Sequence, residues 1–431
     1  MFSVLTLPLH KSDHIQSIGR EVFAFFLFLM YNTNTRYYSG RREFSAASCS
    51  ALPDKKMPCP EQLPFITEEE IPMSEYIISQ IKPSDRRASR QMDALLQQEG
   101  IERDKNLDYS VGLFDEDYNL AAVGSCFSNT LRCLAVSSEH QGEGLLNQVL
   151  SHLMEYQYNR GNTSLFLYTK CNTARFFGDL GFYEIARVDG KVVFMENRKT
   201  GFADYLKKLQ AETGQSQAAQ AAALLPDPRT GAVVMNANPF TLGHRRLVEY
   251  AASQMDLLHV FVVSEDVSLV PLSVREQLIR EGTADLGNLV YHQTGPYMIS
   301  NATFPSYFLK DNDTVIRSHA RLDIQVFRKI AGALNISRRF VGEEPFSQVT
   351  GIYNQVMKEE LEAAGIACTV IPRREDSDGP ISASGVRELL RDGNWEALQK
   401  KVPESTFRYF TSEKAAPVLQ RLREAGEVRH Y

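Results

Sequence analysis

The chain has 431 residues and a formal net charge of −6, and 43 % of its residues are hydrophobic and 23 % charged. This length exceeds one ordinary hydrophobic core, so we expect two or three domains. The balance of apolar and charged residues is that of a folded globular protein, which argues against a disordered or fibrous chain. General nucleic-acid binders are more often basic, so we expect no nucleic-acid partner.

The first sixty residues show no helical or strand periodicity. Their apolar run, Val22 to Tyr31, is about half the length that a transmembrane helix needs, so we expect no membrane partner. With the small residues 46–48, the run loosely resembles a secretory signal, but the long segment of mixed charge before it argues against export. We expect residues 1–60 to be a poorly ordered extension, or upstream sequence before a start near Met57, and the protein to be cytoplasmic.

Six cysteines are scattered along the chain without a CxxC pair or a neighbouring histidine cluster. This spacing indicates neither a zinc site nor a disulfide framework. We therefore expect reduced thiols and no metal ion bound by the protein's own side chains.

Three segments follow the extension. Residues 61–200 alternate strand-like and helix-like stretches, which predicts a mixed α+β domain. Residues 201–229 are rich in Gln and Ala and contain a Pro-Asp-Pro breaker, which indicates a linker. Residues 230–431 repeat apolar strand and amphipathic helix, which predicts a Rossmann-like, doubly wound parallel sheet with helices on both faces.

Ligands of such sheets bind beyond the carboxyl ends of the strands, where helices begin. The first of these junctions reads MNANPFTLGH and ends at His244. Gly243 would let the backbone approach a polyphosphate, and Thr241 and His244 can donate hydrogen bonds as negative charge shifts. The alternative interpretation is a plain turn at Asn238, with His244 as an ordinary capping or surface residue.

The second junction reads ISASGVR and again lies at a predicted helix start. The hydroxyls of Ser382 and Ser384 and the guanidinium of Arg387 would meet phosphate there.

Together the two junctions resemble the paired TxGH-type and ISxSxxR-type motifs of the nucleotidyltransferase superfamily, which face each other across bound ATP. The resemblance implies that Thr241 and His244 bind the ATP phosphates and stabilise the transition state of adenylyl transfer. It implies that Ser382, Ser384 and Arg387 hold the β and γ phosphates. By the same resemblance Phe240 and Gly243 would shape the pocket, and Asn238 is a further candidate for nucleotide binding. Gly342 and Glu343 follow a predicted strand and are candidates for a nucleotide contact or a pocket wall, with a solvated loop as the alternative.

Longer segments resemble the citrate lyase ligase family within this superfamily, among them EGTADLGNL, YMISNATFPSYFLK and RFVGEEPFSQVTGIYN. The resemblance implies that ATP, accompanied by Mg²⁺, and acetate give acetyl adenylate and pyrophosphate. The acetyl group then passes to the thiol of a coenzyme-A-like prosthetic group on the acyl carrier subunit of citrate lyase. Asp323 and Arg317 are candidates for an acetate or thiol site, and a surface ion pair is the alternative.

The earlier segment LRCLAVSSEHQGEGLLNQVLSHLMEY resembles the acyl-coenzyme-A motif of GNAT acetyltransferases, and NTARFFGDLGFYE resembles their later asparagine segment. Gln141, Gly142 and Gly144 would turn backbone N–H groups toward a pyrophosphate at a helix start. Leu146 stands where the motif usually has a small residue, and a plain turn is the alternative. We expect this GNAT-like domain to dock the prosthetic group of the carrier.

Two other functions remain open. The first is a GNAT acetyltransferase fused to a nucleotidyltransferase of cofactor biosynthesis, which would release pyrophosphate without acetate. The second is a non-catalytic nucleotide-binding module. That module would be expected to lack the phosphate-binding side chains, but Thr241, His244, Ser384 and Arg387 are all present.

Overall fold

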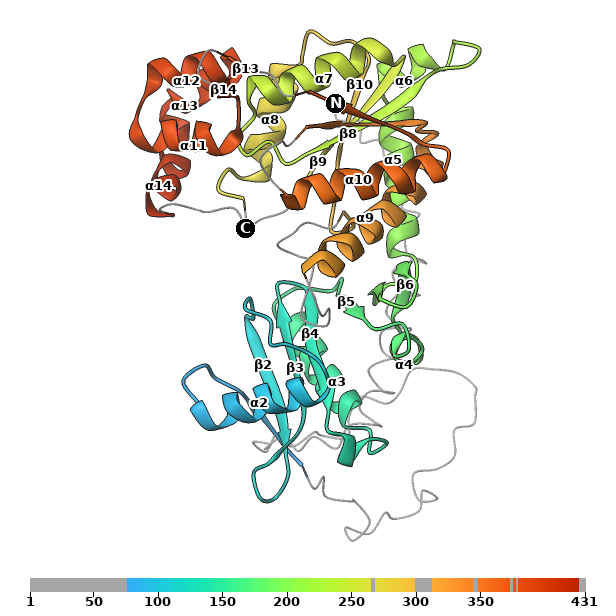
Figure 1. Ribbon diagram of the computed structural model, residues 1–431, viewed down its shortest axis with the longest axis vertical. Coiled ribbons are helices and arrows are strands. Elements are labelled where there is room, and N and C mark those ends of the chain that lie inside the picture. Colours follow the sequence, from blue (N-terminus) through green and yellow to red (C-terminus); the bar gives the residue numbers. More distant parts are fainter. Residues whose placement is uncertain are drawn as a thin grey trace, which may run out of the picture. The chain divides into compact units, whose positions relative to one another are not determined.

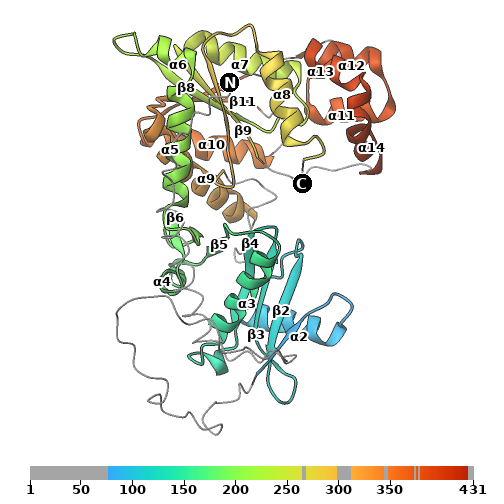
Figure 2. The same cartoon turned by 180° about the vertical axis from the view of Figure 1, so that it is seen from behind.

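The computed structural model describes residues 76–264, 268–298, 312–343, 348–372, 375–376 and 379–425 (Figures 1 and 2). The expected extension and its apolar run lie outside the described residues. Among the described residues, contacts gather those of Ile78–Leu113 and Asn119–Tyr431 into one compact unit, whereas Ile77 and Phe114–Tyr118 belong to the other. Among the described residues, no helix is both long and apolar enough to cross a membrane.

The first sheet has seven strands in the order β1-β2-β3-β4-β5-β7-β6. These are β1 (Ile77–Gln80), β2 (Tyr109–Phe114), β3 (Leu120–Phe127), β4 (Thr130–Val136), β5 (Phe166–Thr169), β6 (Tyr183–Val188) and β7 (Val192–Glu196). The helices are α2 (Arg86–Gln98), η3 (Ser138–His140), α3 (Leu145–Asn159) and α4 (Ala174–Asp179). β4 and β5 run parallel and pair at Thr130 and Leu131 of β4, well before β4 ends. This mixed sheet with its helices agrees with the α+β architecture expected for the first domain.

The predicted linker is largely helical, forming α5 (Gly201–Gly214) and α6 (Gln217–Ala222). Tyr205 and Leu209 of α5 are buried in a core that also holds residues of β5, β6 and β7. Gln and Ala are good helix formers, so the composition that we interpreted as a linker favours packed helix instead. The domain boundary stays a prediction.

The second sheet has five parallel strands in the order β10-β9-β8-β11-β12. These are β8 (Thr230–Met235), β9 (Leu257–Val262), β10 (Leu289–Gln293), β11 (Arg338–Gly342) and β12 (Ala367–Ile371). The larger helices are α7 (Leu242–Gln254), α8 (Leu272–Gly282), α9 (Asn312–Leu334), α10 (Gln348–Ala363) and α11 (Ala383–Asp392). Shorter elements are β13 (Glu375–Asp376), β14 (Gly379–Pro380), α12 (Trp395–Lys401), α13 (Glu404–Phe410), η4 (Glu413–Ala415) and α14 (Ala416–Glu424).

Helices cover both faces of the parallel sheet, and successive strand residues face opposite layers. Ala232 of β8 and Phe261 of β9 lie in the core that contains α5, α9 and α10. Val233 and Met235 of β8 lie in the core built with α7, α8 and α11. Because strand side chains alternate with a period of two, each buried strand serves both layers. The predicted doubly wound fold is confirmed.

The chain order places a topological switch point at β8. From β8 the chain moves outward to β9 and β10, and it then crosses to β11 on the other side of β8. The loops after β8 and β11 therefore leave the same sheet edge in opposite directions. Open parallel sheets bind ligands in the crevice at such a point.

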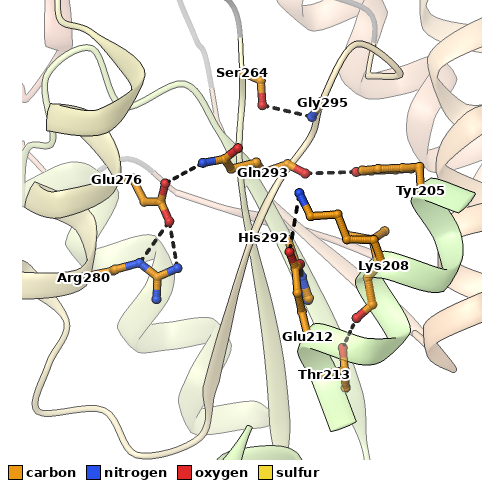
Figure 3. A network of polar contacts seen from close by, with 11 residues as sticks. Tyr205, Lys208, Glu212, Thr213, Ser264, Glu276, Arg280, His292, Gln293 and Gly295 are labelled. Carbon is orange, nitrogen blue, oxygen red and sulfur yellow. Dashed lines mark hydrogen bonds and ion pairs between the residues drawn. The ribbon is translucent and has the colours of Figure 1, made fainter. Parts of the chain in front are cut away.

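A polar chain of two buried histidines and a partly exposed glutamate lies between β9, β10 and α5 (Figure 3). His292 Nδ1 lies 2.7 Å from a carboxylate oxygen of Glu212, and His292 Nε2 lies 3.0 Å from Nδ1 of His259. Because the carboxylate can only accept, His292 carries its proton on Nδ1 and accepts at Nε2. His259 therefore donates from Nδ1, so both rings are held in defined neutral tautomers.

We expect acid to destabilise the fold through these rings. Burial lowers the pKa of His259 to about 3 and also lowers the pKa of His292. The unfolded chain binds these protons near pH 6.5 and the folded chain does not, so their stability contribution is complete above 6.5 and falls as the pH drops below it. His259 alone should account for about 2 kcal/mol between pH 6.5 and pH 5.

Urea unfolding at pH 7.5 and pH 5.0 measures this loss, and His259→Asn is the control. Asparagine keeps a donor for His292 but does not titrate, so the variant should lose less stability than the wild type over the same pH step. An equal loss in both proteins would contradict the assignment.

Candidate nucleotide site

The turn between β8 and α7 is organised by a reciprocal cap. The Thr241 backbone N–H donates to His244 Nδ1 at 3.1 Å, and the His244 N–H donates to Thr241 Oγ1 at 3.4 Å. This capping box satisfies two backbone donors at the helix start, and Thr241 is buried within it. The capping role that the sequence left open for His244 is therefore present.

The cap also fixes the protonation of the imidazole. A ring nitrogen that accepts a hydrogen bond carries no proton, so neutral His244 has its proton on Nε2. Nε2–H is a donor at the positive end of α7, which favours an anion. The capping role and a phosphate-binding role use different nitrogens and are compatible.

The two sequence motifs meet although they lie far apart in the chain. Arg387 NH1 donates to the carbonyl of Asn238 at 2.7 Å across a separation of 149 residues. A Cβ added at Gly243 would lie 3.3 Å from the carbonyl oxygen of Ile381, tighter than most real Cβ contacts. Glycine at this position therefore permits the close approach of the α7 start to the second motif.

The second motif begins α11 with a small cluster of hydroxyls. Ser382 caps the helix by accepting from the N–H of Gly385 at 3.0 Å, and the Ser384 hydroxyl lies 3.3 Å from that of Ser382. Arg387 follows one turn later and is buried, which lowers the pKa of its guanidinium. Two helix starts, hydroxyls and a guanidinium thus gather at one place, a combination suited to polyphosphate.

Phe240 differs from its expected place at the nucleotide. Its ring is fully buried and stacks on the His244 ring with centroids 6.0 Å apart. Its carbonyl accepts from the hydroxyl of Thr406 in α13 at 3.0 Å. Phe240 therefore supports the His244 side chain from the core.

Gly342 and Glu343 lie at the carboxyl end of β11, beside the end of β8. The Glu343 N–H donates to the carbonyl of Ile371 in β12 at 2.9 Å, and its side chain is exposed. Both residues are therefore at the switch point, where a nucleotide contact was expected.

Asp323 is neither a surface residue nor paired with a surface arginine. It is 3 % exposed, accepts from the hydroxyl of Tyr353 at 2.6 Å and lies 3.6 Å from Arg339 NH1. The alternative of a surface ion pair is wrong for Asp323, because α9 turns this residue toward β11 and α10. These contacts connect α9 and α10 to β11.

Sequence reasoning missed Arg275 and Thr406, which contact the backbone of the first motif. Arg275 is fully buried and donates to the Asn236 carbonyl at 2.9 Å. One signal was available, because Arg275 shares the buried stripe of α8 with Leu278, Ile279 and Gly282. A charged residue within an apolar helical stripe requires buried polar partners.

The glycine turn before α3 in the first domain is open. Gly142 and Gly144 have φ of 96° and 75°, and a Cβ at either would meet nothing within 4 Å. Gln141 is exposed, and Gly144 precedes α3 without a side-chain cap. Glu143 in the same turn lies 3.5 Å from His140. The backbone at this helix start is accessible to a ligand.

Among the described residues, no group of three His, Cys, Asp or Glu side chains could hold a metal ion. The described cysteines are free thiols: Cys126, Cys133, Cys171 and Cys368.

Comparison with known proteins agrees with the sequence motifs. Residues 230–410 match the family model of the citrate lyase ligase C-terminal domain. A citrate (pro-3S)-lyase ligase of Klebsiella pneumoniae is 40 % identical over 324 residues, which are 74 % of this chain and 91 % of that protein. The chain belongs to the citrate lyase ligase family. The ligase of Escherichia coli K12 is 37 % identical over 345 residues, 77 % of this chain and 93 % of that protein. The family resemblance predicted from the residues is confirmed, and the chain is an enzyme of the ligase class.

Solved acetyltransferase structures also align with part of this chain. An acyl-CoA N-acyltransferase from Pseudomonas aeruginosa is 14 % identical, with a TM-score of 0.25, over 28 % of this chain and 99 % of that one. A GNAT-family acetyltransferase from Staphylococcus aureus is 13 % identical, with a TM-score of 0.24, over 28 % of this chain and 98 % of that one.

Proposed function

We propose that the chain activates acetate with ATP at the switch point of the parallel sheet and transfers the acetyl group to citrate lyase. The acceptor is the thiol of the coenzyme-A-like prosthetic group on the acyl carrier subunit, and its acetylation activates citrate lyase. We expect this reaction to take place in the cytoplasm, where ATP is available. The meeting of the two phosphate-binding motifs, through Arg387 and Asn238, is the observation that carries this proposal.

The chemistry proceeds in two steps. An acetate oxygen attacks the α phosphorus of ATP, the bond to the bridging oxygen breaks, and pyrophosphate leaves. The carrier thiolate then attacks the acetyl carbon, and AMP leaves. Positioning and charge stabilisation do most of the work in such phosphoryl chemistry. His244 Nε2–H, the α11 hydroxyls and Arg387 supply donors for the negative charge that develops on pyrophosphate.

Mg²⁺ enters with ATP as the substrate complex. It reduces the repulsion between the phosphates and the attacking carboxylate. The side chains named above are donors and cations rather than carboxylates, which suits them to the phosphate oxygens of that complex.

The prosthetic arm docks at the glycine turn before α3. The residues fit this group, because Gly142 and Gly144 leave open the space that a Cβ would occupy and expose backbone at a helix start. A dephospho-coenzyme-A-like arm carries a pyrophosphate, which such a turn binds. The arm supplies the acceptor thiol when bound.

The test is pyrophosphate release from ATP with acetate present or absent, and with holo acyl carrier subunit in a parallel reaction. Acetate-dependent release that rises with the carrier supports the ligase. Release that ignores acetate would replace this proposal with a nucleotidyltransferase of cofactor biosynthesis.

The docking site has its own test in Gly144→Asp. Aspartate tolerates a left-handed conformation better than most residues, and it would place a negative charge beside the pyrophosphate of the arm. We expect KM for the holo carrier to rise about tenfold, equivalent to 1.4 kcal/mol, while pyrophosphate release without carrier is unchanged.

Gly161→Asp is the matched control, because Gly161 has φ of 84°, open surroundings and a place at the other end of α3. Equal effects of the two substitutions on KM would argue against docking at the turn.

A further inference from the structure

The turn after β8 contains a residue in an unfavourable conformation. Ala237 has φ of 48° and is 1 % exposed. A side chain with a Cβ pays a steric cost in this left-handed region, so the surroundings must hold it there. Hydrogen bonds to the residues on both sides of Ala237 provide this restraint.

Each flanking carbonyl accepts a hydrogen bond from an arginine of a different helix. Arg387 of α11 holds the Asn238 carbonyl, and Arg275 of α8 holds the Asn236 carbonyl at 2.9 Å. The two anchors therefore restrain the strained residue from opposite sides. Both arginines also hold a carbonyl oxygen of the turn against positive charge.

Arg275 joins three backbone segments at this sheet edge. Its Nε donates to the Val270 carbonyl at 3.0 Å, and its NH1 donates to the Val263 carbonyl at 2.7 Å and to Asn236 Oδ1 at 2.8 Å. The end of β8, the end of β9 and the start of α8 are thus connected by one guanidinium. The planar fork of arginine suits several fixed acceptors, and an ammonium cannot reproduce it.

Further bonds connect the same segments. The Val270 N–H donates to Asn238 Oδ1 at 3.0 Å, and the Ser268 hydroxyl donates to Asn236 Oδ1 at 3.1 Å. Arg275 is therefore the buried centre of a network that sets the path from β8 to the Thr241 and His244 cap.

We propose that Arg275 is a positioning residue of the nucleotide site, which holds the strained turn at Ala237 in the conformation that binds ATP phosphates. This inference rests on the ATP site proposed above. Arg275 is fully buried and bonds the backbone of the turn and the Asn236 side chain, so its effect is transmitted through the turn.

The experiment compares wild type, Arg275→Lys and Arg280→Lys by calorimetric titration with ATP and Mg²⁺ and by pyrophosphate release. Arg280 is the matched control, because it lies on the same helix, is exposed and pairs with Glu276 at 2.7 Å. We expect Arg275→Lys to weaken ATP binding about tenfold or more, as for a lost charge-assisted hydrogen bond, and Arg280→Lys to leave it unchanged.

Relief of the strain distinguishes positioning from general stability. Ala237→Gly removes the steric cost, so it should improve ATP affinity about fivefold more in the Arg275→Lys background than in wild type. All proteins are measured well below their unfolding temperatures. Equal effects of Ala237→Gly in the two backgrounds, or wild-type affinity in Arg275→Lys, would overturn the proposal.

Asn236→Ala tests the same proposal if Arg275→Lys does not fold. Asn236 is exposed, and its side chain accepts from Arg275 and Ser268. The variant should weaken ATP binding about threefold or more with an unchanged unfolding temperature, and unchanged affinity would overturn the proposal. ATP binding is measured without acetate, so it tests the role of Arg275 independently of the ligase reaction. Acetate-independent turnover by the wild type would reject the ligase reaction but not the role of Arg275 in ATP binding.

Discussion

Replacement of His244 by alanine should reduce acetate-dependent pyrophosphate release about 100-fold or more, with a smaller change in KM for ATP. A donor aimed at charge that develops in the transition state contributes on this scale, as for an oxyanion-hole donor. The capping box leaves the proton of neutral His244 on Nε2, at the N-terminus of α7. Single-turnover measurement of pyrophosphate release at saturating ATP tests this expectation.

The capping role of His244 complicates the alanine variant, and His244→Glu resolves it. Alanine removes the acceptor for the Thr241 N–H, which should cost about 1 kcal/mol of stability. Glutamate at this third helical position completes a capping box with threonine, so the helix start is retained. It replaces the phosphate donor by a negative charge.

His244→Glu should therefore unfold near the wild-type temperature but lose at least as much activity as His244→Ala. Near-normal turnover in either variant would exclude His244 from the adenylyl-transfer step. Loss of activity only in the less stable alanine variant would reduce its role to capping.

The parallel sheet and the meeting of the two motifs at its edge were predictable from the sequence for a physical reason. Apolar strands alternating with amphipathic helices require both sheet faces to be covered, and the carboxyl ends of parallel strands share one edge. Motifs that follow β8 and precede α11 therefore had to converge. The contact between Arg387 and Asn238 is the result.

The contacts that could not be predicted from the sequence involve partners that no sequence pattern identifies. Arg275 binds backbone carbonyls, which every residue carries, so its spacing along α8 indicated burial but not its target. Phe240 lies within a motif that suggests ligand contact, yet its ring is in the core. Local sequence gives the motif, and tertiary packing decides which of its side chains face the ligand.

The helices α5 and α6 also could not be predicted from local sequence. A polar, alanine-rich stretch can be a flexible linker or a helix, and the outcome depends on whether a neighbouring surface buries its apolar residues. Here Tyr205 of α5 is buried and donates to the carbonyl of Gln293 at the end of β10. Figure 3 shows this contact, which no periodicity in the chain indicates.

Replacement of Arg387 by alanine should lower kcat/KM for ATP roughly 30-fold, the effect of losing about 2 kcal/mol from a charge-assisted hydrogen bond. Lysine should recover part of the loss, since it keeps the charge but not the fork. Arg391→Ala is the matched control, because Arg391 lies one turn along α11 and pairs with Asp392 at 3.5 Å. Steady-state kinetics with ATP varied at saturating acetate measures all three variants.

The affinity for AMP separates two explanations of an Arg387 defect. If the guanidinium holds the β and γ phosphates, Arg387→Ala should weaken the binding of ATP and pyrophosphate while AMP binds as before. If Arg387 acts only by bracing the Asn238 carbonyl, the whole turn shifts and AMP affinity should fall together with ATP affinity. Competition by AMP and by pyrophosphate against ATP therefore decides whether the arginine binds the leaving group or shapes its pocket.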